Sequence, residues 1–449
     1  MVKIAHALEK VKRTYDQMIP ATTILEIAAA IGHTHRQRIL GPVETIHLFL
    51  VQILHGNTAC SHLRHLTDVT CSVAAYCKAR GRLPASLLRC LLTWVCHCLR
   101  DVTERDSLWL GHRLFHLDGS SFSMPDTESL QAAFGQPGGQ KKGCGFPTAH
   151  LLAMVDATTG MILDILASPL RTHEMSKVSS THSKLRPGDV LVADRGFCSY
   201  AHLALLFQRG LHAVLRIHQR IIVDFTPGRP HAGLKVAKSQ NGMPRSRWLR
   251  CLGTKDQVVQ WCKPKGRPRW MSSKDYALLP KSITVRELEY RIETSGYRTR
   301  HVTLVTTLLD DETYTAKDLA ELYRCRWQIE VNLRHLKQTM GMDVLRCQTP
   351  DAVLKEMLTF ALVYNLVCRV IYEAAQRQGV PPDRISFIDA LRWLQTHSPG
   401  RELIDLIVNP RRVGRFEPRV VKRRPKQYPL MTEPRDVLRN RHRNQHVTP

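Results

Sequence analysis

The sequence has no run of apolar residues long enough to cross a lipid bilayer, which takes about 18–20 residues. Its most apolar stretch, MLTFALVYNLVCRVIY at 357–372, is interrupted by Asn365 and Arg369. The first residues, MVKIAHALEKVKRTYDQ, lack the apolar segment of a secretory signal peptide. These absences argue against a membrane-spanning or secreted protein, and we expect a cytoplasmic protein whose apolar stretches form buried helices.

The usual metal-binding cysteine motifs are also missing. The 13 cysteines are odd in number, scattered along the chain and never separated by two residues. The one local cluster, Cys96–His97–Cys98, lies in a helical pattern, where consecutive side chains point in different directions. The sequence therefore predicts reduced thiols and argues against a disulfide framework or a structural zinc site.

Acidic residues are scarce relative to basic ones. The 449 residues include 65 Lys and Arg but 39 Asp and Glu, which gives a formal net charge of +26. Such a charge favours a polyanionic partner, above all nucleic acid, because each neutralised phosphate releases counterions. An acidic membrane surface is the competing partner. With 43% hydrophobic residues, the chain is otherwise typical of a soluble globular protein of two or three domains.

The first segment, residues 1–108, carries apolar residues at three- and four-residue spacing and predicts a helical domain. Basic residues between the predicted helices make it a candidate DNA-binding domain: Arg36, Arg38, Arg64, His65, Arg80 and Arg82. A scaffold bundle with solvated arginines fits nearly as well.

Four further segments follow from changes in composition. Residues 109–220 show strand patterns interspersed with a helix, and residues 301–400 return to an apolar strand followed by helices. Together they predict an α/β fold with a mixed sheet covered by helices. Residues 221–300, rich in Pro, Gly, Arg and Lys, predict an inserted β-rich subdomain. Residues 401–449 form a basic tail that is too polar to build a core.

The stretch YRCRWQIEVNLRHLK at 323–337 lies in an amphipathic pattern that predicts one helix from about 316 to 340. Thr315 and Asp318 provide a capping-box start, and Gly341 is a natural stop.

One face of this helix carries an unusual set of polar residues. At about 100° per residue, Tyr323, Arg326, Glu330 and Lys337 fall within about 60° of one another. A lone carboxylate therefore shares a narrow face with two cations and a phenol. The plain alternative is a solvated face with an Arg326–Glu330 ion pair.

Two further carboxylates stand where they could reach Glu330. Asp118 lies in the predicted strand LFHLDGSSF, and Asp194 lies at the carboxyl end of another, VLVADRGF. Taken singly, Asp118 could be a turn residue and Asp194 half of a surface ion pair. Acids on a strand, at the end of a neighbouring strand and on a packed helix can meet, and three carboxylates suit Mg²⁺ or Mn²⁺.

Such a site fits phosphoryl transfer, because two ions can clamp the attacking and leaving oxygens. Arg326 and Lys337 would hold DNA phosphates against the metal ions, and Tyr323 would donate a hydrogen bond to a phosphate oxygen.

Taken together, these motifs resemble those of bacterial insertion-sequence transposases of the DDE class, family four. The resemblance rests on LDGSSF, on VADRGF and on the order Y-x2-R-x3-E-x6-K within residues 323–337. It extends to GFP and DATTG after the first acid, LVTTLLD before the helix and KRRPKQYPLMTEPR in the tail. It thus covers most of residues 110–435.

The resemblance implies a ribonuclease-H-like catalytic core, interrupted before its last helix by a β-rich insertion. It implies that Asp118, Asp194 and Glu330 are the catalytic residues and the ligands of Mg²⁺ or Mn²⁺. It also implies a homodimer that acts on double-stranded DNA, at terminal inverted repeats and at target sites, in the bacterial nucleoid. By analogy, the enzyme nicks the transposon end, and the freed 3′-hydroxyl attacks the opposite strand and then target DNA.

One family position differs. Relatives that form a DNA hairpin carry a tryptophan just before the LVTT-like strand, where it stacks on a flipped base. His301 and Val302 occupy that place in this sequence, so His301 or Trp270 of the insertion are the candidates to replace it.

Three more basic residues are candidate DNA contacts. Arg216, in HAVLRIH, matches a family position for a phosphate contact, although a strand-edge arginine is the alternative. Lys141 and Lys142 lie in the loop GQPGGQKKGCG, which lacks the GK[ST] of a phosphate-binding P-loop and is expected to be a flexible loop near DNA.

Two functions other than transposition stay open at this point. One is a sequence-specific DNA-binding protein that derives from a transposase and no longer cleaves. The other is a structure-directed nuclease on the same core, which would cut branched or generic DNA and would not join strands.

Overall fold

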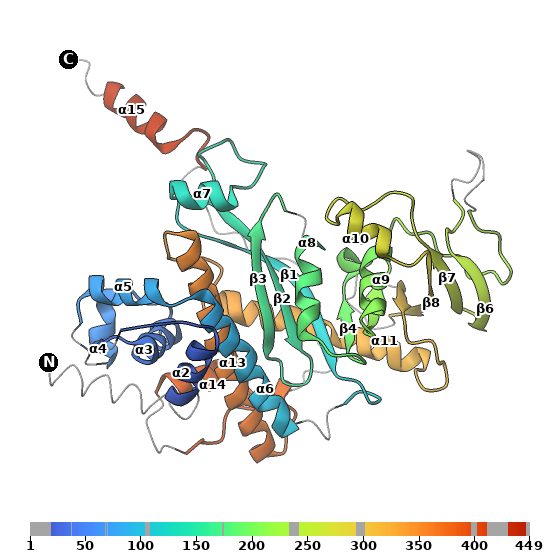
Figure 1. Ribbon diagram of the computed structural model, residues 1–449, viewed down its shortest axis with the longest axis horizontal. Coiled ribbons are helices and arrows are strands. Elements are labelled where there is room, and N and C mark those ends of the chain that lie inside the picture. Colours follow the sequence, from blue (N-terminus) through green and yellow to red (C-terminus); the bar gives the residue numbers. More distant parts are fainter. Residues whose placement is uncertain are drawn as a thin grey trace.

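The computed structural model describes residues 19–36, 38–67, 69, 71–103, 108–172, 175–232, 242–292, 301–396, 402–410 and 430–445. These residues form an α/β protein in which helices surround one large mixed sheet (Figure 1). The predicted α/β class is confirmed. The amino-terminal segment 1–18 and the basic stretch 411–429 of the tail lie outside the described residues.

The first part of the chain is helical, as its periodicity predicts. Its helices are α2 (Ala21–Ala30), α3 (Pro42–Leu54), α4 (Leu63–Thr67), α5 (Val73–Arg82) and α6 (Ala85–Thr103). Helix α3 begins with Pro42, whose fixed φ and missing N–H suit a first helical turn. Almost every side chain of α3 is buried, because other helices enclose it, among them α2, α5 and the long helix α13 (Pro350–Gln378).

The sheet has nine strands in the order β3-β2-β1-β4-β5-β9-β8-β7-β6. They are β1 (Leu114–Ser123), β2 (Thr148–Asp156), β3 (Ile162–Pro169), β4 (Val190–Ala193), β5 (His212–Arg216), β6 (Arg247–Gly253), β7 (Asp256–Cys262), β8 (Ser282–Arg291) and β9 (His301–Thr306). Strands β1, β4 and β5 run parallel, and the other neighbouring strands pair antiparallel.

The strands expected to form an inserted subdomain extend the central sheet. Strand β9 pairs with β5 on one side and with β8 on the other, so β6, β7 and β8 continue the same ladder. A single cluster of buried apolar residues reaches from Ile19 to Leu406. The segment boundaries at 108, 220, 300 and 400 therefore stay predictions.

Helices cover both faces of the parallel strands. Val190, Val192 and Val214 face α11 (Ala316–Cys325) through Leu319 and Leu322. The intervening residues of β4 and β5 point the other way, toward the large core that includes α9 (Tyr200–Gln208). Apolar residues on both sides are what a parallel sheet with two covered faces requires.

The remaining helices lie around this frame. They are α7 (Glu128–Phe134), α8 (Met175–Thr181), α10 (Ser273–Leu278), α12 (Trp327–Arg334), α14 (Phe387–Gln395) and α15 (Arg435–Gln445). Within the described part of the chain, α13 alone is long and apolar enough to cross a membrane, but 78% of its most apolar window is buried inside the protein. It is a core helix, as its interrupting Asn365 and Arg369 predict. Helix α15 was not expected in the polar tail, and it projects from the body (Figure 1).

A buried carboxylate ties three parts of the chain together. Glu356 of α13 is 1% exposed and accepts hydrogen bonds from the side-chain amide of Asn57, at 2.5 Å, and from the backbone N–H groups of Arg346 and Cys347, at 2.9 and 2.8 Å. The neighbouring Leu345 donates its N–H to the carbonyl of Ser123 at the end of β1. Glu356 thus joins the amino-terminal helices to the end of the central strand.

Replacing Glu356 with alanine should lower the free energy of unfolding by about 3 kcal/mol, because it leaves a buried amide and two backbone donors without an acceptor. Urea unfolding measures this loss. Glu373→Ala on the same helix is the matched control: Glu373 is 47% exposed and pairs with the partly exposed Arg369, so its loss should cost less than about 0.5 kcal/mol. Equal losses in the two variants would contradict the assigned role of Glu356.

Candidate active site

The helix that carries the YRCRWQIEVNLRHLK stretch begins and ends where predicted but is not a single helix. Thr315 Oγ1 accepts a hydrogen bond from the N–H of Asp318 at 3.2 Å, and Gly341 ends the segment with φ of 85°. Between them, α11 and α12 meet at Arg326, and a π-helical turn follows at His335–Thr339. The prediction of one continuous α-helix is therefore wrong. A π turn shifts the positions of the residues after it, and such turns are frequent at functional sites.

The parallel register of the central strands places Asp118 beside Asp194. Leu117 of β1 pairs with Ala193 of β4, so the two aspartates that follow are neighbours at the same level. Ala193 also pairs with Leu215 of β5, which brings Arg216 into the same row. Side chains alternate along a strand. The row therefore faces the side of the sheet that packs against α11.

Residues from the helix reach all three acids. The Nη2 of Arg326 donates to Glu330 Oε1 at 2.9 Å, and its Nη1 lies 3.7 Å from Asp118 Oδ2. The hydroxyl of Tyr323 donates to Asp194 Oδ1 at 3.1 Å. Asp118, Asp194 and Glu330 thus converge on one guanidinium and one phenol.

The last residue of the signature contacts the same strand. Lys337 Nζ donates to the hydroxyl of Ser120 at 2.8 Å, and Ser120 lies two residues after Asp118 on the same face of β1. Of the sequence candidates, the structure therefore gathers Asp118, Asp194, Glu330, Tyr323, Arg326 and Lys337.

The loop lysines are placed differently. Lys141 and Lys142 are exposed on the loop between α7 and β2, where Gln136 holds the carbonyls of residues 140 and 141. In the described part of the chain, neither lysine makes a hydrogen bond or ion pair with the acids.

Burial and charge act together on Asp118. Burial raises the pKa of its carboxyl to about 6, although the N–H of Gly119 and the charge of Arg326 oppose the rise. The charges of Glu330 and Asp194 raise it further, because like charges nearby disfavour the ionised carboxylate.

The same surroundings also raise the pKa values of Arg326 and Tyr323. The pKa of Arg326 is raised because its acidic neighbours outweigh the opposite effect of burial. Burial also raises the pKa of Tyr323, so its hydroxyl keeps the proton that it donates to Asp194.

The carboxylates of Asp118, Asp194 and Glu330 are of a type that binds hard divalent ions, but in this arrangement Arg326 lies beside Asp118 and Glu330. Among the described residues, no three His, Cys, Asp or Glu side chains are placed so that one metal ion could contact them. The carboxylates face Arg326 instead, and its Nε and Nη1 atoms are buried and have no hydrogen-bond partner among the residues that the structure describes. Three carboxylates are nevertheless the ligand type that Mg²⁺ and Mn²⁺ prefer. Holding an ion between them requires Arg326 to turn away.

Two residues near the site were not singled out from the sequence. His116, two residues before Asp118, is 3% exposed, and burial together with the charge of Arg326 lowers its pKa to about 4. Trp327, which follows Arg326, is 57% exposed. The tryptophan inside the signature could have been noticed from the sequence, although its exposure could not, and nothing local distinguishes His116 from a core histidine.

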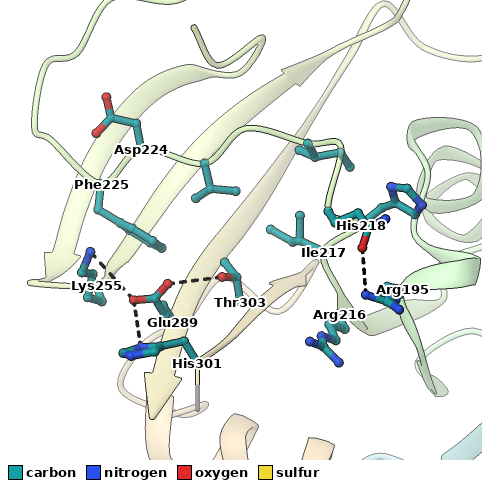
Figure 2. A pocket seen from close by; sticks show the side chains of 13 residues that line it. Arg195, Arg216, Ile217, His218, Asp224, Phe225, Lys255, Glu289, His301 and Thr303 are labelled. Atoms are coloured by element: carbon teal, nitrogen blue, oxygen red, sulfur yellow. Dashed lines mark hydrogen bonds and ion pairs between the residues drawn. The ribbon is translucent and has the colours of Figure 1, made fainter. Parts of the chain in front are cut away.

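A cavity of about 440 Å³ adjoins the row of strand ends (Figure 2). Arg195 and Arg216 form one side of it, and Phe225 and His301 lie on the other (Figure 2). Glu289 lies between basic neighbours, with its Oε1 at 3.7 Å from Nδ1 of His301. Trp270, a candidate for base stacking, packs instead against the apolar core.

The raised pKa of Asp118 predicts a pH-dependent effect of its removal. An acid with a raised pKa holds its proton more tightly in the folded state, so above pH 6 the ionised carboxylate destabilises the fold, and this cost fades between pH 6 and 4. With a chelator present, Asp118→Asn should raise the free energy of unfolding at pH 8 by about 1–3 kcal/mol, and the gain should disappear by pH 4.

Denaturant unfolding at the two pH values measures this difference. Asp405→Asn is the control, because the side chain of Asp405 is 75% exposed and its removal should change little at either pH. A destabilising effect of Asp118→Asn at pH 8 would contradict the electrostatic account.

Comparison with known proteins identifies the family. A sequence model of the family described as the transposase DDE domain matches residues 109–366, more than half of the chain. The chain is 26% identical over 376 residues to the transposase InsG of insertion sequence element IS4 from Escherichia coli strain K12, across 79% of this chain and 78% of that protein. Over 51 residues it is 45% identical to the transposase of insertion sequence element IS421 from Escherichia coli, across 11% of this chain and 14% of that protein.

A solved structure adds a weaker likeness. The piggyBac transposase in a synaptic complex with hairpin DNA aligns with a TM-score of 0.40 and 12% identity, over 87% of this chain and 79% of that one. A likeness at this level carries no argument about the present chain.

The family match begins just before β1 and ends inside α13, so it includes both aspartates and the signature helix. The resemblance inferred from the motifs is confirmed. The chain belongs to the DDE transposases, and among them to the insertion-sequence family that includes the transposase of IS4.

Proposed function

We propose that this DNA transposase moves its own insertion sequence by a cut-and-paste reaction in which Asp118, Asp194 and Glu330 are the catalytic carboxylates. The observation that carries the proposal is their convergence: an acid on β1, an acid after β4 and an acid on α12 surround the same pair of side chains, Arg326 and Tyr323. A solvated ion pair would not require the two aspartates to be there.

The sheet supports a ribonuclease-H-like core. Strands β3, β2 and β1 are antiparallel, β4 and β5 follow parallel to β1, and the additional strands β6 to β9 enter before α11. This is the arrangement expected of such a core with an insertion before its last helix. It brings the carboxyl ends of β1 and β4 together, where acids from distant parts of the sequence can act jointly.

Asp118, Asp194 and Glu330 would hold divalent ions, Mg²⁺ or Mn²⁺, which supply an activated nucleophile and stabilise the charge that develops on the phosphoryl oxygens. The chain's own groups have separate tasks. Arg326 pairs with Glu330 and lies near Asp118, and it would turn its fork-shaped guanidinium to a DNA phosphate. Tyr323 donates a hydrogen bond to Asp194, and Lys337 donates one to Ser120 on the strand of Asp118. Both side chains would position the DNA backbone at the acids.

The cavity beside Asp194 is suited to an extruded nucleotide. Arg195 and Arg216 can hold its phosphates, while the ring of Phe225, with Lys255 Nζ 5.2 Å from its centre, and His301 offer surfaces for a base. Base stacking on aromatic side chains contributes about 1–3 kcal/mol. Phe225 and His301 would thus take the part that a tryptophan has in relatives that form hairpins.

The remaining assignments rest on family membership and charge. The DNA partners would be the terminal inverted repeats and the target duplex, with Lys141 and Lys142 as backbone contacts from their exposed loop. The active form would be a homodimer in the bacterial cytoplasm, close to the nucleoid. The net charge of +26 suits such a polyanionic partner.

Removing one carboxylate tests the catalytic assignment. With Mg²⁺ and a duplex that ends in the element's terminal repeat, Asp118→Asn, Asp194→Asn and Glu330→Gln should each lose at least about a thousandfold in strand cleavage, while DNA affinity stays within a few-fold of wild type. Gel assays of cleavage and binding report both quantities. Glu321→Gln, an exposed acid on α11, is the matched control and should cleave normally.

The alternatives give different results in the same assay. A DNA-binding descendant would show no cleavage by wild type. A structure-directed nuclease would cut duplexes without the repeat equally well and would not join strands. Full cleavage by Glu330→Gln would refute the assigned role of that residue.

The nucleotide cavity is tested by its aromatic side chain. Phe225→Ala should slow the attack on the second strand about tenfold, as expected from the loss of one base–aromatic stack, and should leave the first nick unchanged. Phe207→Ala, an aromatic residue of α9 that is 55% exposed, is the control. A uniform slowing of both steps by Phe225→Ala would argue against a base in this cavity.

A further inference from the structure

Two thiols from different elements meet among the amino-terminal helices. Cys60 begins the 3₁₀ turn Cys60–His62, and Cys77 lies on α5. Their Sγ atoms are 3.9 Å apart, which is van der Waals contact. Cys77 is exposed and Cys60 is partly buried. Because the sulfurs of a disulfide are about 2 Å apart, a small rotation of the two side chains would bring these sulfurs to bonding distance.

Arg80 lies beside this thiol pair and belongs to the interior. Its guanidinium stacks on Phe49 at 3.8 Å, and its Nη1 donates to Gln52 Oε1 at 3.1 Å. The expectation that Arg80 contributes to a DNA-binding surface is corrected by these contacts. The same Nη1 lies 3.7 Å from Cys60 Sγ, and Nη2 donates to Cys347 Sγ at 2.9 Å. Arg80 is thus a fixed cation next to the sulfur of Cys60.

The surroundings of the two sulfurs differ. Cys60 Sγ accepts from Arg80 Nη1 and from Gln52 Nε2, both at 3.7 Å, and a cation and a second donor can stabilise negative charge on a sulfur. At Cys77, partial burial and then Cys60 raise the pKa of the thiol, although the charge of Arg80 opposes the rise. A thiolate beside a thiol that keeps its proton suits stepwise thiol–disulfide exchange.

We propose that Cys60 and Cys77 form a reversible disulfide with each other by exchange with small-molecule disulfides. The Cys60 thiolate attacks one sulfur of the small disulfide, whose S–S bond breaks and releases one thiolate. Cys77 then loses its proton, and its sulfur attacks Cys60, which forms the new S–S bond and releases the second thiolate. The small disulfide gains two electrons, and the two thiol protons end on its two thiol products. This proposal does not rest on the proposed function.

The bond would constrain the amino-terminal helices. Residues 60 and 77 are 17 positions apart and enclose α4, and a cross-link of this kind removes conformations from the unfolded chain. Through Arg80 the pair adjoins Cys347, whose N–H is held by Glu356. In a reducing compartment such a disulfide is transient and responds to oxidants. The thiol pair would therefore make the stability of these helices depend on the oxidation state.

Incubation of the full-length protein with oxidised glutathione tests the proposal. After the remaining thiols are blocked with N-ethylmaleimide, digestion with trypsin and chymotrypsin separates Cys60, Cys71 and Cys77, and mass spectrometry identifies linked peptides. Wild type should yield a Cys60–Cys77 peptide and lose both thiols of the pair. Dithiothreitol should restore them. Cys77→Ser should leave Cys60 unlinked.

Cys90→Ser is the matched control, because it removes another exposed thiol, from α6, and should form the bond as wild type does. A Cys60–Cys71 peptide in place of Cys60–Cys77 overturns the proposal. So does a wild-type protein that carries glutathione on both cysteines without joining them. Thermal unfolding of the reduced variants verifies that the fold is intact.

The melting temperature gives a second readout. Oxidation should raise the Tm of wild type and of Cys90→Ser by at least about 2 °C, because the cross-link restricts the unfolded chain, and should change that of Cys77→Ser much less. A lower Tm in oxidised wild type would contradict the geometric argument, since the bond would then strain the native helices.

Discussion

Three carboxylates in a partly buried site repel one another, and the rest of this site depends on how that repulsion is compensated. Arg326 contributes to this compensation through an ion pair with Glu330 and a position near Asp118. Burial, and to a smaller extent the charges of Glu330 and Asp194, still raise the pKa of Asp118 to about 6. A site of this kind favours the binding of cations. A phosphoryl-transfer enzyme that depends on metal ions needs this property.

The sheet makes this concentration of acid possible. Because β1 and β4 are parallel and in register, the residues after Leu117 and Ala193 must be neighbours, and both are aspartates. Apolar contacts with the valines of β4 and β5 position α11 on the same face, and α11 leads directly into α12, which supplies Glu330. The layer between the sheet and α11 therefore contains apolar contacts that stabilise the fold, and the acids lie at the carboxyl ends of the same strands.

The additional strands β6 to β9 extend the sheet that carries the acids. Since β9 bridges β5 and β8, the insertion belongs to the same sheet as the acids, and Arg216 and His301 lie on paired strands around one cavity. Glu356 provides the corresponding link on the other side, between the amino-terminal helices and the end of β1. Through these links, the amino-terminal helices and the strands that carry the acids form one connected frame.

Local chemistry allowed the sequence alone to determine several features. The cap at Thr315, the stop at Gly341 and the position of Asp194 at a strand end depend on a few neighbouring residues, and each is found in the structure. The shared face of the signature helix follows from helical periodicity. Family membership followed from the same residues because their order and spacing are specific.

Other features were decided by contacts between distant residues, which no local pattern encodes. The break at Arg326 and the π turn at His335–Thr339 lie on either side of α12, which packs on β1, and Lys337 in that turn donates to Ser120. The same holds for Arg80, which composition alone could not distinguish from a solvated arginine, and for β9, whose two partners join the insertion to the core. The three acids could be picked out from the sequence. Only tertiary packing decided that Arg326 lies beside Asp118, because this contact joins a strand and a helix more than 200 residues apart in the chain.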